Sequence, residues 1–195
     1  QCHSPTPGAG IGFPRISVSV QPSVRSLASG QSISIAIAAS GGQTASMLGG
    51  FACDTTAGTF SAGVNTVLVP PNRAITHSNS SSRSWSFGYT APTTPGVVSL
   101  YAVSNTVNGD MLNGPEDMWA FHGADDQDTN STPVYLFVNA NGVQNVGRSC
   151  AGAFGNVPVL GSAQVPSVGN ASFALEMHGG PPLSPMPLVS SDMEH

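Results

Sequence analysis

Hydrophobic and polar side chains alternate along most of the first 122 residues of the chain. The clearest run is residues 84–89, where Trp85, Phe87 and Tyr89 fall on one face of a predicted strand. A period of two is that of a β-strand with one face in a core. Further runs bounded by turn residues cover 16–20, 33–37, 47–53, 64–69, 97–103 and 118–122. Short strands at this spacing predict an all-β fold, an immunoglobulin-like Greek-key sandwich.

The segments between and beyond these runs suggest how the chain is divided. Prolines and glycines in residues 1–14 predict an irregular leader, which places the sandwich at 15–122. Residues 123–133 hold three aspartates and no large apolar side chain, so we expect an acidic linker there. Apolar runs then predict a smaller β-module with a tail over 134–195. A unit of that size buries little apolar surface, so we expect it to lean on the sandwich, accept a strand from a neighbouring subunit, or belong to a longer sandwich.

Composition narrows the class of partner. The net charge is −5 and all five basic residues are arginines, so the clustered positive charge that nucleic acid requires is missing. No apolar run reaches the roughly 20 residues of a membrane-spanning helix, and no signal peptide is visible. Serine-, threonine- and asparagine-rich chains without lysine are commonly extracellular. We therefore expect an exported protein whose signal peptide has been removed.

Candidate chemistry from single motifs leaves several alternatives open. The three cysteines, Cys2, Cys53 and Cys150, favour one disulfide and one cysteine with another role, or three free thiols. The aspartates at 125, 126 and 128 could bind Ca²⁺ but lack the rest of an EF-hand loop, so a solvated linker is the plainer interpretation. A free N-terminus with His3 third could bind Cu(II). The motifs G-x-S-x-G and H-E-x-x-H are missing, and no acid pair suits a glycosidase, so we expect no enzyme.

Six short blocks in the first 122 residues carry a family resemblance. In order they are Gly49-Gly50-Phe51, residues 57–60, Thr76-His77-Ser78, residues 85–92, residues 95–102 and residues 105–110. In this order they resemble bacterial reeler-like domains, which are secreted β-sandwich modules also known as choice-of-anchor domains. Residues 134–189 resemble a C-terminal β-module of secreted bacterial proteins.

The resemblance implies a haem c. Many bacterial reeler-like proteins carry C-x-x-C-H just before the first strand, and this chain has its last two residues, Cys2 and His3, while the first cysteine would precede Gln1. On this hypothesis Cys2 holds the haem, and His3 and His77 are the axial ligands of the iron. His122 is the alternative distal ligand, with Met111 and Met118 in the same region. Without the resemblance, His77 is most simply a residue of a serine-rich loop.

Two functions follow from these expectations. The first is a secreted mono-haem electron-transfer subunit that assembles into an extracellular polymer, with Cys53 and Cys150 forming a disulfide between its two modules. The second is a cofactor-free adhesive or structural surface module, which assembles by strand addition through its C-terminal part. Both make the chain a homo-oligomer, and neither identifies a redox partner.

Overall fold

A computed structural model describes residues 15–42, 46–112, 114–123, 132–143 and 157–180. Every regular element in these ranges is a β-strand, and none is a helix that could cross a membrane. The strands are β1 (Ser17–Pro22), β2 (Ser26–Ala28), β3 (Ser32–Ser40), β4 (Leu48–Thr55), β5 (Thr59–Ser61), β6 (Thr66–Val69), β7 (Ala74–His77), β8 (Ser84–Thr90), β9 (Gly96–Val107), β10 (Met118–Phe121), β11 (Val134–Asn139), β12 (Val159–Gly161) and β13 (Glu176–His178).

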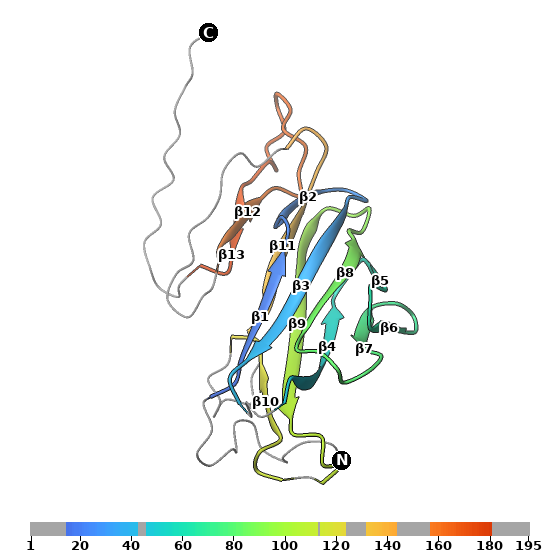
Figure 1. Ribbon diagram of the computed structural model, residues 1–195. Helices are drawn as coiled ribbons and strands as arrows, with labels where there is room; N and C mark the ends of the chain where they lie inside the picture. The colour runs from blue at the N-terminus through green and yellow to red at the C-terminus, as the bar shows by residue number, and fades with distance from the viewer. Residues whose placement is uncertain (1–14, 43–45, 113, 124–131, 144–156, 181–195) are drawn as a thin grey trace.

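Two sheets pack face to face as a β-sandwich (Figure 1). The smaller sheet has the order β1-β3-β8-β5. The larger has the order β2-β11-β9-β4-β7-β6, and β10 also pairs with β9. The first half of β9 pairs with β11 and its second half with β10, so these two short strands share one edge of the longest strand. The predicted all-β sandwich is confirmed.

The predicted aromatic strand forms the centre of the core. Trp85, Phe87 and Tyr89 of β8 are at most 3% exposed. Phe51 of β4 meets them from the opposite sheet, because its ring stacks on Phe87 with centroids 5.6 Å apart and lies 4.8 Å from Trp85. Such aromatic contacts add to the free energy gained by burying apolar area. Phe51 therefore fixes β4 in place on the core side, directly behind the groove described below.

Strand β11 differs from the expected division of the chain. It pairs antiparallel with β9 and parallel with β2, within the larger sheet. Its inward side chains, Val134, Leu136 and Val138, belong to the same hydrophobic core as the sandwich strands. Strand β11 therefore packs as part of the sandwich, which agrees with the expected alternative of a longer sandwich. An apolar run cannot reveal from sequence alone which sheet it joins, because that depends on a long-range pairing.

The remaining C-terminal strands cover the outer side of β11. β12 and β13 form a two-stranded antiparallel sheet beside it (Figure 1). The ring of Phe137 lies against Gly161, where a side chain would collide with it, and the Ala140 amide donates to the Ser162 carbonyl at 2.9 Å. Hydrophobic and polar residues alternate over residues 171–177, but only the end of this run, with His178, forms a strand, β13. Phe173, Leu175 and Met177 remain exposed.

Candidate functional site

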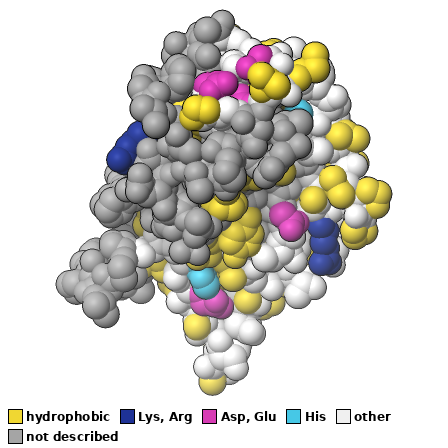
Figure 2. All heavy atoms as spheres, turned by 90° about the horizontal axis from the view of Figure 1, so that it is seen from below, with side chains coloured by type: hydrophobic (Ala, Val, Ile, Leu, Met, Phe, Trp, Pro, Cys, Tyr) yellow, Lys and Arg dark blue, Asp and Glu magenta, His cyan; other side chains and the backbone are white. Residues whose placement is uncertain are grey.

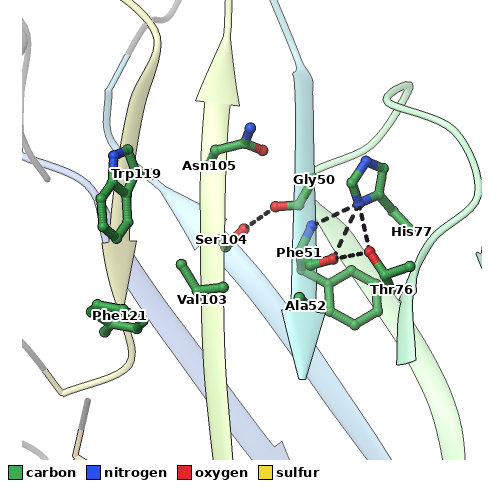
Figure 3. Close-up of a pocket in the computed structure, with 10 residues that line it drawn as sticks. All are labelled: Gly50, Phe51, Ala52, Thr76, His77, Val103, Ser104, Asn105, Trp119 and Phe121. Atoms are coloured by element: carbon green, nitrogen blue, oxygen red, sulfur yellow. Dashed lines mark hydrogen bonds between the residues drawn. The ribbon is translucent and has the colours of Figure 1, made fainter. Parts of the chain in front are cut away.

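A groove of about 400 Å³ lies on the outer face of the larger sheet (Figure 3). Its position follows from the strand register, since two rows of side chains cross the sheet there. The first row runs across four strands: Phe121 on β10, Val103 on β9, Ala52 on β4 and Thr76 on β7. The second row runs parallel to it: Trp119 on β10, Asn105 on β9 and Gly50 on β4, followed by the ring of His77.

The groove forms because large side chains at one end of these rows are followed by very small ones in the middle. Trp119 and Phe121 stand at one end with their rings edge to face, 5.4 Å between centroids. Gly50 and Ala52 in β4 have almost no side chain, so the floor drops between the aromatic wall and β7. The lining is mostly apolar, and its volume falls in the range of sites for small molecules and cofactors.

His77 forms the other end of the groove. β7 ends at this residue, and its imidazole continues the line of the strand beside β4 (Figure 3). Nδ1 lies 3.1 Å from both the amide nitrogen and the carbonyl oxygen of Phe51, and 3.2 Å from Oγ1 of Thr76. Nε2 has no hydrogen-bond partner among the described residues. The ring also lies near Trp85, with centroids 6.4 Å apart.

Gly50 makes the position of His77 feasible. A Cβ built on Gly50 would stand 2.4 Å from Cε1 and 2.8 Å from Nε2 of His77. Both distances are shorter than real Cβ contacts, so any larger residue would displace the imidazole or β4. The blocks Gly49-Gly50-Phe51 and Thr76-His77-Ser78, which are 25 residues apart in sequence, therefore meet at one point.

Most polar groups in the groove are already paired. The Thr76 hydroxyl donates to the Phe51 carbonyl at 2.6 Å, and the Ser104 hydroxyl donates to the Gly50 carbonyl at 2.7 Å. Asn105 is different, because its Oδ1 is buried and has no hydrogen-bond partner. Two polar atoms are thus left over beside Gly50, namely Nε2 of His77 and Oδ1 of Asn105. The sequence analysis proposed His77 as a ligand, which stays a prediction, and did not anticipate that Asn105, Gly50 and the aromatic wall of Trp119 and Phe121 lie in the same groove.

The alternative distal ligands lie elsewhere. His122 does not line the groove; Nδ1 of its ring lies 2.9 Å from the Val18 carbonyl, and the ring borders a separate hollow of only about 10 Å³. Burial lowers the pKa of His122, and the charge of Arg25 adds to this, although the Val18 carbonyl opposes it. Met118 is buried in the core, and Met111 is fully exposed. The fold does not bring any of these three side chains to His77.

The cysteines and the N-terminal histidine are only partly within the described chain. Cys2, His3 and Cys150 lie outside the described residues, so neither the haem attachment nor the disulfide is tested. Cys53 has no disulfide partner within the part of the chain that the structure describes; it lies in the core, 2% exposed, and burial together with the neighbouring Asp54 carboxylate raises the pKa of its thiol to about 12. The described residues contain no group of three or more metal-binding side chains. The acidic segment at 125–128 is also outside them.

Comparison with known proteins adds little. No protein-family model matches the chain, and no curated protein matches it. Among solved structures, Spo0M, a sporulation control protein from Bacillus subtilis, is similar over 67% of this chain with 12% sequence identity and a TM-score of 0.30. The match spans 51% of Spo0M. A likeness this weak supports no statement about function.

Proposed function

We propose that the protein is a secreted, non-enzymatic electron-transfer subunit of the reeler-like class, in which a c-type haem occupies the groove beside His77. The haem would be held covalently through Cys2, with His3 as one axial ligand and His77 as the other. Bound haem supplies a one-electron redox centre, and two histidine ligands suit electron transfer rather than oxygen chemistry. The chain would act in an extracellular polymer of identical subunits.

The observation that carries the proposal is the setting of His77. A histidine at the end of an apolar groove with an aromatic wall, whose Nε2 has no hydrogen-bond partner among the described residues, suits a haem ligand. Ligating histidines are commonly fixed through their second nitrogen, which donates to a carbonyl. The Phe51 carbonyl, 3.1 Å from Nδ1, is placed to accept that hydrogen bond. The residues present therefore fit the group.

The first test is the absorption spectrum and intact mass of the purified full-length protein. The proposal predicts a Soret band, a low-spin spectrum, and a mass that includes one haem. His77→Ala should convert the iron to high spin, because one axial ligand is removed. His122→Ala is the matched control and should leave the spectrum unchanged. A low-spin spectrum in His77→Ala that is lost in His122→Ala would move the ligand role to His122, and the lack of any Soret band would refute the haem.

A cofactor-free surface module is the second candidate, and one observation favours it. Phe173, Leu175 and Met177 expose 39%, 47% and 39% of their surface beside and within the short strand β13. Contiguous exposed apolar side chains often mark contact surfaces between proteins. A chain without haem that associates through this region would be an adhesive or structural subunit.

A further inference from the structure

The hydrogen bonds around His77 specify where its proton lies when no ligand is bound. The Phe51 amide is a buried donor that must find an acceptor, and Nδ1 of His77 accepts it at 3.1 Å. The Phe51 carbonyl already accepts from the Thr76 hydroxyl at 2.6 Å. If that hydroxyl turned to Nδ1 instead, Nδ1 would again be the acceptor. In both arrangements Nδ1 carries the lone pair. They favour a ring proton on Nε2, because a proton on Nδ1 would leave the Phe51 amide without this acceptor.

The nearest unsatisfied acceptor to that proton is Asn105. Three buried side-chain atoms in the described part of the chain lack a partner, namely Trp85 Nε1, Asn105 Oδ1 and Thr106 Oγ1, and of these residues Asn105 alone lines the groove. Its Oδ1 lies 2.9 Å, and Nε2 of His77 lies 2.8 Å, from the point where a Gly50 Cβ would stand. The two atoms face the same empty space, which exists because residue 50 is a glycine (Figure 3).

We propose that Asn105 is a positioning residue for His77, and that its Oδ1 accepts the Nε2 proton across Gly50 in the ligand-free protein. The terminal torsion of an asparagine side chain has a broad range, so a small rotation of the amide closes the pair. Closing it gives the buried Oδ1 the partner that it otherwise lacks. The Phe51 amide and Asn105 then hold the two ring nitrogens from opposite sides.

This arrangement has a consequence for ligand binding, and that consequence rests on the proposed function. A metal can bind Nε2 only after the proton moves to Nδ1, where the Phe51 carbonyl accepts it. Asn105 stabilises the protonated Nε2 and so opposes coordination. Removing its acceptor should strengthen binding of iron porphyrin about three- to tenfold, the change expected from one hydrogen bond. If Asn105 instead contacted the bound ligand favourably, removing its acceptor would weaken the binding of iron porphyrin.

The test uses the full-length, ¹⁵N-labelled protein without ligand. Long-range ¹H–¹⁵N correlation spectra of the histidine rings at neutral pH should show His77 protonated on Nε2, with that proton in slow exchange with water. Asn105→Leu should speed the exchange at least several-fold. Asn105→Asp keeps an acceptor and should restore slow exchange. Val97→Ala, on the same strand but outside the groove, should leave the signal unchanged.

Two outcomes overturn the inference. One is a wild-type ring protonated on Nδ1, and the other is an Nε2 proton that exchanges equally fast in wild type and Asn105→Leu. Melting temperatures of all variants show whether a lost signal reflects unfolding. If Asn105→Leu is unfolded, the Asn105→Asp variant tests the inference instead, because it should keep the slow exchange of the Nε2 proton. Titration with iron porphyrin is the second arm. If the iron porphyrin spectrum does not change to a low-spin, shifted Soret band with the wild type while the ring spectra behave as expected, the proposed function fails and the role of Asn105 stands.

Discussion

The thiol of Cys53 lies inside the sandwich on the core face of β4. Its pKa of about 12 leaves almost no thiolate at neutral pH, and the thiolate is the reactive form. We therefore expect alkylation by iodoacetamide to be very slow in the folded protein and fast after unfolding in denaturant with a reductant present, as measured by mass spectrometry. Fast alkylation of Cys53 in the native state would contradict the burial.

The same measurement tests the proposed disulfide. If Cys53 is joined to Cys150, no alkylation of Cys53 occurs in denaturant until a reductant is added. Alkylation without reductant would exclude the bond. Cys53→Ser is the matched control, because it removes the thiol from the core while leaving Cys2 and Cys150 to react.

At the scale of elements, the position of β11 in the larger sheet implies that the cooperative unit of the sandwich extends to at least residue 139. Leu136 is fully buried between β9 and β2, in the core that β8 also fills. Leu136→Ala should reduce the free energy of unfolding by about 2–5 kcal/mol, because it removes buried methyl groups and leaves a cavity. Val97→Ala, on the neighbouring strand but 39% exposed, should change it by less than about 1 kcal/mol.

Chemical denaturation followed by tryptophan fluorescence makes this measurement. Trp85 lies in the sandwich core, so a single transition shifted by Leu136→Ala indicates that β11 and the sandwich unfold together. Two transitions, of which only one shifts, would instead support the division at residues 123–133 expected from sequence.

At the scale of the whole molecule, the chain carries few charges, since charged residues make up only 8% of it. Figure 2 shows few charged side chains, scattered among hydrophobic and uncharged ones on the face that it views. The exposed side chains Phe173, Leu175 and Met177, which do not line the groove, are defined here as the β13 patch.

The β13 patch gives a prediction about assembly. Replacing Phe173 and Leu175 by serine should lower the weight-average mass in sedimentation velocity at high protein concentration, because the apolar area available for association shrinks. Val64→Ser is the control, since Val64 is 83% exposed but lies in the turn before β6. A wild-type protein that stays monomeric at every concentration would refute assembly through the patch.

The alternation of Trp85, Phe87 and Tyr89, and of the isoleucines in β3, determined the strands and the β class, because a period of two depends only on neighbouring residues. His77 was also identifiable, but only through resemblance. Tertiary structure alone decided that β11 joins the sandwich, that Gly50 and Asn105 lie beside His77, and that Trp119 and Phe121 form a wall opposite it. These relations depend on which strands pair and in which register, and a shift of one residue would move each side chain to the other face of the sheet.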